Sequence, residues 1–303
     1  MNVLFDNVDF GSNSGPNAFA GKLAKAFSEL DINAVNNISK SQKIDIQLSF
    51  IASSYKVAPI VQRLDGIYFN SDQDYQSLNT PICETFHAAS AVIYQSDFNK
   101  KLTEKWFGEH ENGNVIHNGT CLDVISKIQP MQNPVLDKFS DVWSCASSWR
   151  PHKRLSENVR YFLESASTDA CLVIAGQNPD FQAKNDRVLY AGELQWQDLI
   201  SLFKRSSKFL HLSWLDHCPN VVIDAQASGC SVVCSSSGGT HEIVNENGTI
   251  IEEDLWDLSP IRLYNPPKMD FSRESQSENS ADLDITDVAE KYKDVFMNLL
   301  ESV

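Results

Sequence analysis

The sequence predicts an α/β fold with two domains, each built on a parallel sheet. Short apolar runs alternate with segments of helical period along most of the chain, which is typical of parallel strands joined by helices. The 303 residues allow two domains of ordinary size, and a hydrophobic content of 42% can form sizeable cores. Residues 285–300 add one amphipathic helix near the end of the chain.

The first half of the chain begins with a strand at 3–5, a glycine-containing loop and a helix at about 17–30. Gly11 and Gly15 lie in the loop, but their spacing differs from the G-x-G-x-x-G of dinucleotide-binding proteins. A plain turn is therefore an equal alternative to a ligand contact. Further elements are expected as strands at 44–51, 59–64, 91–94 and 114–117 and as a helix at 97–107.

The second half should form the other sheet. Residues 118–140 contain two prolines and several polar side chains, so we expect the link between the domains there. Trp196 belongs to an expected helix at 196–203, where apolar spacing favours a core position over a stacking surface. Residues 268–284 are polar enough to form a mobile surface segment. Strands are expected at 141–147, 171–175, 188–190, 209–212 and 231–234.

The most informative stretch is 209–244, in which a strand, a turn, a helix, a second strand and a glycine pair follow one another. Pro219 suits the first position of a helix, and Gly229 suits a left-handed helix end. Such a helix begins at the carboxyl end of a parallel strand, where backbone N–H groups favour an anion such as a diphosphate. Asp216 and Asp224 lie eight positions apart, so one can reach a sugar and the other a ribose. An ordinary strand-helix-strand unit with two solvated aspartates is the alternative.

Two basic residues, Arg150 and Lys153, follow the expected strand at 141–147. Basic side chains are unfavourable at a helix N-terminus, which indicates a bound anion at this place. Arginine can grip two phosphate oxygens and lysine adds a compact charge, so both suit an anion that carries phosphate groups. The alternative is a basic helix start on an acidic protein.

Charge, cysteines and hydropathy narrow the class of protein. The 25 basic and 40 acidic residues give a formal charge of -15, which argues against nucleic acid or an anionic membrane as a general partner. The seven cysteines show no zinc-type pairing, so buried free thiols in a reducing compartment are expected. No apolar run approaches a membrane span, and the chain enters a strand directly, so we expect a cytoplasmic protein without membrane association.

The stretch 209–244 resembles the E-x7-E signature of retaining glycosyltransferases of family four. The resemblance extends to the Pro-Asn turn at 219–220, the glycines at 238–239, the segment VIHNG at 115–119 and the cations after the strand at 141–147. Two features depart from the family pattern. Asp216 and Asp224 replace the two glutamates, and Asp65 stands in a neighbourhood where many relatives carry a histidine.

This resemblance implies the GT-B fold, with two Rossmann-like domains, a cleft between them and a C-terminal helix that crosses back to the first domain. The implied domain ranges are 1–130, 131–284 and 285–303. The implied reaction transfers a sugar from a nucleotide-sugar donor to a carbohydrate or other hydroxyl acceptor, with retention of configuration. It needs no metal ion, because the cations and the helix start replace it, and no cofactor, because the nucleotide sugar is itself a substrate.

The resemblance also implies roles for individual residues. Arg150 and Lys153 would neutralise the diphosphate, and Asp216 would contact the transferred sugar near the reacting carbon. The implied donor-binding residues are Asp224, Gly192, Glu193, Leu194, His217, Cys218, Pro219, Asn220 and Val221, with Gly11, Gly15 and Asp65 in loops that face the cleft. For Asp65, the sequence favours a residue of a surface turn over this contact. For the whole chain, the alternatives are a non-catalytic GT-B binding or scaffold protein and a nucleotide-sugar epimerase.

Overall fold

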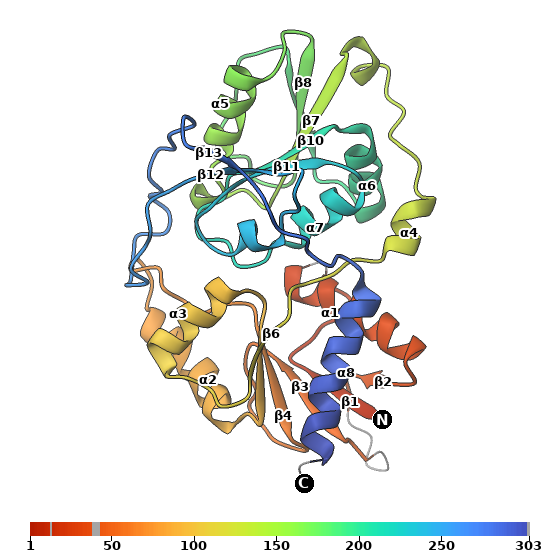
Figure 1. The fold of residues 1–303 in the computed structure, drawn as a ribbon, viewed down its shortest axis with the longest axis vertical. Coiled ribbons are helices and arrows are strands. Elements are labelled where there is room, and N and C mark those ends of the chain that lie inside the picture. Colours follow the sequence, from red (N-terminus) through yellow and green to blue (C-terminus); the bar gives the residue numbers. More distant parts are fainter. Residues whose placement is uncertain (13, 38–42, 302–303) are drawn as a thin grey trace. The chain divides into compact units, whose positions relative to one another are not determined.

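The computed structural model describes residues 1–12, 14–37 and 43–301, which form two compact units (Figure 1). Unit 1 comprises Met1–Cys121, Leu258–Pro260 and Asp282–Val303, and unit 2 comprises Leu122–Asp257 and Ile261–Ala281. The units change over at 121–122, whereas the sequence placed this change at 130–131. Asn13 in the glycine loop and the last two residues of the expected 285–303 helix lie outside the described residues.

Unit 1 contains a six-stranded parallel sheet in the order β2-β1-β3-β4-β5-β6. The central strands are buried on both faces because helices cover both sides of the sheet. The strands are β1 Asn2–Asp6, β2 Asn33–Val35, β3 Ile46–Phe50, β4 Ile60–Leu64, β5 Ala91–Tyr94 and β6 Gly113–Val115. The helices are α1 Gly15–Glu29, α2 Tyr75–Ala88, α3 Asp97–Phe107 and α8 Ile285–Glu301.

The last helix, α8, completes the core of unit 1 and lies alongside α1 (Figure 1). Its apolar face buries Tyr292 and Phe296, which meet Phe27 of α1 with ring centroids 6.3 and 5.7 Å apart. The amphipathic pattern of residues 285–300 therefore predicts this helix correctly, and the burial of its aromatic residues ties it to the first sheet.

Unit 2 contains a seven-stranded sheet in the order β13-β12-β11-β10-β7-β8-β9, parallel except for β13. The strands are β7 Asp141–Ala146, β8 Ala170–Ala175, β9 Val188–Gly192, β10 Lys208–His211, β11 Ser231–Ser235, β12 Thr249–Ile251 and β13 Glu274–Gln276. The helices are α4 Leu122–Lys127, α5 Leu155–Ser165, α6 Trp196–Arg205 and α7 Asn220–Ala227, with short 3-10 helices η1 Leu136–Lys138, η2 Pro151–Lys153 and η3 Thr240–Ile243.

Side chains from the strands of unit 2 pack against helices on both faces of the sheet. Trp143 of β7 packs against Phe162 of α5, with ring centroids 5.6 Å apart. On the other face, Phe209 of β10 packs against Phe203 of α6 at 4.9 Å. Lys208 pairs with Trp143 and Phe209 pairs with Ser144, so the two aromatic residues stand one register position apart and face opposite sides of the sheet. Helices on both sides explain why the central strands are buried on both faces.

Two elements, β13 and α2, were not expected from the sequence. Residues 268–284 are largely exposed, as expected of a surface segment, but they contain β13 and bury Met269 and Ser277. Their polarity is that of an edge strand, which needs little apolar surface. Helix α2 was not predicted, because it contains Pro81 at an internal position where proline removes a helical hydrogen bond.

All seven cysteines are free, and five of them are buried. None of the helices described in the structure is long and apolar enough to cross a membrane.

Candidate functional site

Two turns meet at the carboxyl ends of β7 and β10, which are neighbours in the sheet of unit 2. The first turn follows β7 and contains η2, and the second follows β10 and leads into α7. The backbone amide of Trp214 donates a hydrogen bond to the carbonyl of His152 at 2.7 Å, which joins the two turns. Carboxyl ends of parallel strands gather at one edge of a sheet, so Lys153 and Asp216, 63 positions apart in the sequence, become neighbours here.

Lys153 and Asp216 form an ion pair between these turns. Lys153 Nζ lies 2.5 Å from Asp216 Oδ2, and the two side chains are 19% and 15% exposed. His211 Nε2 lies 2.9 Å from the same oxygen. Burial raises the pKa of Asp216, but the Lys153 charge and the His211 hydrogen bond outweigh this effect and lower the pKa well below its usual value. Asp216 is therefore ionised at neutral pH.

The backbone of Asp216 is fixed by the glycine pair that the sequence singles out. The Asp216 carbonyl accepts a hydrogen bond from the Gly239 amide at 2.7 Å. Gly238 has a φ of +83°, and a Cβ atom at this position would lie 2.4 Å from the Asp216 carbonyl oxygen. Only glycine allows such a close approach and such a backbone conformation. The glycine pair therefore sets the position of the turn that carries the carboxylate.

Helix α7 begins at Asn220, four residues after Asp216, and Gly229 adopts a φ of +99° just past its end. The N–H groups of its first turn lie at the carboxyl edge of the sheet, an arrangement that favours an anion. Asp224, one turn further on, is 4% exposed, and its Oδ2 accepts a hydrogen bond from the Trp196 indole nitrogen at 2.9 Å. The alternative of a solvated Asp224 is therefore wrong, and Trp196 has a polar role beside its apolar one.

The other predicted donor-side residues also belong to unit 2. Arg150 is exposed at the start of η2. The amide of His217 donates to Asp216 Oδ1 at 3.1 Å, so His217 is in direct contact with the ion pair. The remaining residues lie at the ends of strands or at the start of α7. Gly192 ends β9, Glu193 and Leu194 follow it, and Cys218, Pro219, Asn220 and Val221 lie before or within α7.

Three predicted residues, Gly11, Gly15 and Asp65, lie in unit 1. The Gly11 amide donates to Asp9 Oδ1 at 2.9 Å, which closes the turn after β1, and Gly15 begins α1. Asp65 follows β4. A contact between these residues and a donor or acceptor stays a prediction.

Asp65 is not the surface residue that the sequence favoured. Its side chain is 18% exposed and forms an ion pair with Arg63, which is fully buried. Burial raises the pKa of Asp65, and the Arg63 charge only partly offsets this effect. The Arg63 guanidinium also lies over the ring of Phe19, 4.2 Å from its centroid, and donates to Asn118 Oδ1 at 2.8 Å. Asp65 is thus part of the polar core of unit 1.

Comparison with known proteins finds a family model that matches part of the chain, mostly within unit 2. Residues 144–259 match the family model of glycosyl transferases group 1. This group 1 segment holds Lys153, Asp216 and Asp224, so all three of these predicted donor-site residues lie within the matched region. No curated protein gives a significant match to the sequence.

Solved structures support the fold of the whole chain. The chain is similar to HepE from Anabaena, solved in complex with UDP and glucose, with a TM-score of 0.66 and 14% identity over 98% of this chain and 99% of HepE. It is similar to sucrose-phosphate synthase from Thermosynechococcus elongatus, with a TM-score of 0.71 and 12% identity over 100% of both chains. It is also similar to WaaG, a glycosyltransferase involved in lipopolysaccharide biosynthesis, with a TM-score of 0.63 and 13% identity over 99% and 93%. The predicted GT-B fold is confirmed by these structures.

Two histidines that the sequence analysis did not select lie beside the ion pair of the group 1 segment. His211 bonds Asp216, and His152 is buried and stacks on Tyr264 with ring centroids 5.5 Å apart. His152 stands between Arg150 and Lys153 in the sequence, so its position beside two selected residues was the available signal. Burial is the main reason that the pKa of each histidine is lowered, that of His152 to about 3. Both imidazoles are therefore neutral at pH 7.

Because the pKa values of these buried histidines are lowered, we expect the protein to lose stability in mild acid. Burial also lowers the pKa of His217 to about 4. The unfolded chain takes up these protons near pH 6.5, before the folded state does, so the stabilisation is complete above pH 6.5 and declines as the pH falls. We expect the free energy of unfolding in urea to fall by up to roughly 1.4 kcal/mol per pH unit for each histidine between pH 6.5 and about 4. His152→Phe should reduce this slope by one proton, and a slope unchanged by the variant would contradict the prediction.

The residues that the structure describes contain no cluster of three or more His, Cys, Asp or Glu side chains arranged to bind a metal ion. The charged groups that the structure places at the candidate site are Lys153, Asp216 and Asp224, with Arg150 at the start of η2.

Proposed function

We propose that this protein transfers a sugar from a nucleotide-sugar donor to an acceptor hydroxyl, with retention of configuration and without a metal ion. The observation that carries the proposal is the Lys153–Asp216 ion pair beside the start of α7, inside the group 1 segment. A cation and backbone N–H groups suit a diphosphate, and a carboxylate suits sugar hydroxyls. These are the groups that a nucleotide-sugar donor requires.

The cations would act on the leaving group. Negative charge develops on the diphosphate as the bond to the sugar breaks, and fixed positive groups stabilise that state more than the ground state. Lys153 is held in place by Asp216, and exposed Arg150 can add a second cation from the start of η2. Together with the start of α7, these groups offer the stabilisation for which other enzymes use a metal ion.

The two aspartates would hold the sugar and the ribose. Asp216 is ionised and can only accept hydrogen bonds, so it suits the hydroxyls of the transferred sugar. A carboxylate at this place also stabilises positive charge at the anomeric carbon. Asp224 would accept from the ribose hydroxyls, oriented by the Trp196 indole. The backbone of residues 192–194 would lie along the base.

The free cysteines indicate the kind of compartment in which the protein acts. Five buried free cysteines favour a reducing compartment, and we place the reaction in the cytoplasm as part of this proposal.

A donor screen tests the proposal. UDP-glucose is the first candidate, because a similar structure was solved with it, and a panel of UDP, GDP and ADP sugars should follow. A donor that binds raises the melting temperature. Incubation with EDTA and NMR of the product then test the metal independence and the retention. If no nucleoside diphosphate binds, the proposal is wrong; binding without transfer or hydrolysis indicates a scaffold protein, and an epimerised sugar indicates an epimerase.

The ribose role of Asp224 has its own test. Asp224→Ala should weaken the binding of UDP more than that of 2′-deoxy-UDP, because only the ribose of UDP offers the full pair of hydroxyl donors. One lost hydrogen bond to a charged group is worth about 1.5–3 kcal/mol, or roughly tenfold or more in affinity. Calorimetry with both nucleotides measures the difference, and an equal loss for the two nucleotides would show that Asp224 does not contact the 2′-hydroxyl.

A further inference from the structure

The residues that flank the ion pair have unusual backbone conformations. Arg154, directly after Lys153, has a φ of 51°, and Leu215, directly before Asp216, has a φ of 56°. Residues other than glycine rarely adopt this left-handed region, because Cβ approaches the backbone. Such conformations persist where surrounding contacts fix them. The contacts that fix these two residues therefore also set the positions of Lys153 and Asp216.

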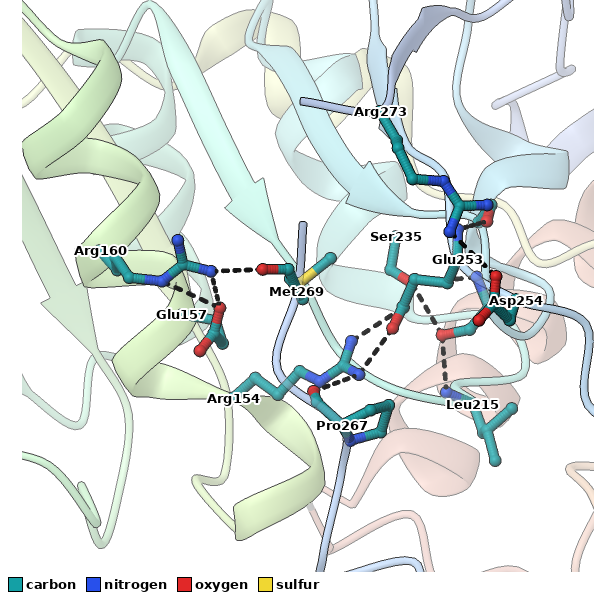
Figure 2. A network of polar contacts seen from close by, with 12 residues as sticks. Arg154, Glu157, Arg160, Leu215, Ser235, Glu253, Asp254, Pro267, Met269 and Arg273 are labelled. Carbon is teal, nitrogen blue, oxygen red and sulfur yellow. Dashed lines mark hydrogen bonds and ion pairs between the residues drawn. The ribbon is translucent and has the colours of Figure 1, made fainter. Parts of the chain in front are cut away.

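Arg154 is fixed by a buried ion pair (Figure 2). Its side chain is 1% exposed and grips both carboxylate oxygens of Glu253, at 2.8 and 2.7 Å. A third hydrogen bond runs to the carbonyl of Pro267 at 3.0 Å, and the guanidinium carbon lies 5.8 Å from the centre of a Trp214 ring. Glycine would adopt this backbone conformation without strain, so the arginine is explained by its side chain and not by the turn.

Serine hydroxyls extend this contact to Leu215. Ser235 Oγ hydrogen-bonds Glu253 Oε2, Ser237 Oγ lies 2.7 Å from Ser235 Oγ, and the Leu215 amide donates to Ser237 Oγ at 3.4 Å. Burial raises the pKa of Glu253, but the Arg154 pair and the serines outweigh this effect and lower it. The ionised carboxylate of Glu253 can only accept hydrogen bonds, so the Ser235 hydroxyl donates to Glu253. The Ser237 hydroxyl then donates to Ser235.

A separate link joins the same turns. Asn158, in α5, donates to the Arg154 carbonyl at 2.8 Å and accepts from the Leu212 amide at 3.3 Å. Together with the bond from Trp214 to His152, this link holds the backbones of the two turns side by side. Neither link reaches Leu215, the residue next to Asp216. Ser235 and Ser237, together with Glu253, thus connect Arg154 to Leu215, the two residues adjacent to the ion pair.

We propose that Arg154, Glu253, Ser235 and Ser237 form a positioning network, which sets the separation of Lys153 and Asp216 for the donor diphosphate and sugar. The proposal rests on the proposed function for the identity of the ligand. The network contacts neither ligand itself, and it acts through the two residues that do. Charged groups held by a rigid second layer act on a substrate better than mobile ones, because their placement costs nothing at the moment of reaction.

The test removes both charges of the network together. In the double variant Arg154→Gly/Glu253→Gln, glycine accepts the left-handed backbone and glutamine still accepts from Ser235, so no unpaired charge is buried. We expect UDP affinity to fall about tenfold and UMP affinity to change by less than about twofold, because Lys153 is assigned to the diphosphate and UMP carries a single phosphate. A network that only stabilised the fold would affect both nucleotides alike.

A matched control uses the neighbouring Arg160–Glu157 pair. Arg160 also donates to a carbonyl of the same segment, that of Met269 at 2.8 Å, but its pair lies on α5 and does not reach the two turns (Figure 2). Glu157→Gln should leave UDP affinity within about twofold of the wild type. Ser237→Ala should lose part of the UDP affinity that the double variant loses. Ser237→Thr keeps the hydroxyl, so its UDP affinity should be that of the wild type.

A ligand-independent measurement separates this proposal from the proposed function. In a crystal structure of the double variant without ligand, the Lys153 Nζ to Asp216 Oδ2 distance should exceed about 4 Å, the limit of an ion pair. An unchanged distance overturns the positioning network, whether or not the wild type binds a nucleotide. Equal UDP affinity in the double variant and the wild type overturns it as well. Failure of the wild type to bind any nucleoside diphosphate refutes the proposed function alone, since the distance still tests the network.

Discussion

Lys153→Ala should weaken UDP binding and slow sugar transfer by roughly 10²-fold or more, the usual effect of removing one well-placed group that stabilises a developing charge. Lys153 Nζ lies in the ion pair with Asp216, beside the start of α7, where the diphosphate is proposed to bind. The stability cost should be about 1–2 kcal/mol, because Asp216 keeps its hydrogen bonds to His211 and to the His217 amide. Calorimetry with UDP and a thermal unfolding curve measure the two effects separately.

A matched control for this variant is Lys138→Ala. Lys138 is an exposed lysine before β7, at the opposite end of the strand that Lys153 follows, so its removal changes the net charge equally. It should leave UDP binding unchanged. The pKa of His211 offers a further check without ligand, because the Lys153 charge helps to lower it. In Lys153→Ala this pKa should rise, as NMR can measure. Full UDP affinity in Lys153→Ala would refute the assignment of the cation.

Asp216→Asn should have the second large effect, and it should fall on transfer and not on binding. The amide keeps the shape of the side chain but removes the charge that is assigned to the transferred sugar. We expect the rate of transfer to fall by roughly 10²-fold. The affinity for UDP should stay the same or rise, because Lys153 loses the partner that neutralises it. Rates from product assays and Kd from calorimetry separate the two quantities, as the assignment requires.

The length of the carboxylate is tested by Asp216→Glu. This variant keeps the charge and restores the glutamate of the family signature, so it should retain more activity than Asp216→Asn. An exposed aspartate of the same unit, changed as Asp180→Asn, is the charge-matched control and should transfer sugar at the wild-type rate. Transfer at the wild-type rate in Asp216→Asn would show that the protein uses another group at the reacting carbon.

Much of the fold follows from local pattern. Strands such as β5 and helices such as α3 match their predicted ranges, 91–94 and 97–107, because their apolar residues repeat with the period of the element. Helix α2 and strand β13 were missed, because one contains a proline and the other is a short polar edge. Apolar periodicity reveals elements with one buried face. Helix α2 is interrupted by a proline and β13 has few apolar residues, so this periodicity is weak in both.

The candidate site divides in the same way. Asp216, Asp224 and Lys153 could be selected from the sequence, because each stands at a fixed offset from a strand or a turn glycine. Their partners could not be selected. Trp196 reaches Asp224 across 28 positions, and Glu253 reaches Arg154 across 99, distances over which no local pattern extends.

The sequence by itself determined which residues are candidates for the chemistry and that they stand at the carboxyl ends of parallel strands, because strand period and turn glycines are local properties. The tertiary structure alone decided how these residues are used. It paired Lys153 with Asp216, placed His211 behind them and tied both turns to Glu253. The physical reason is that burial and charge depend on neighbours in space, and side-by-side strands bring together residues that are far apart in the chain.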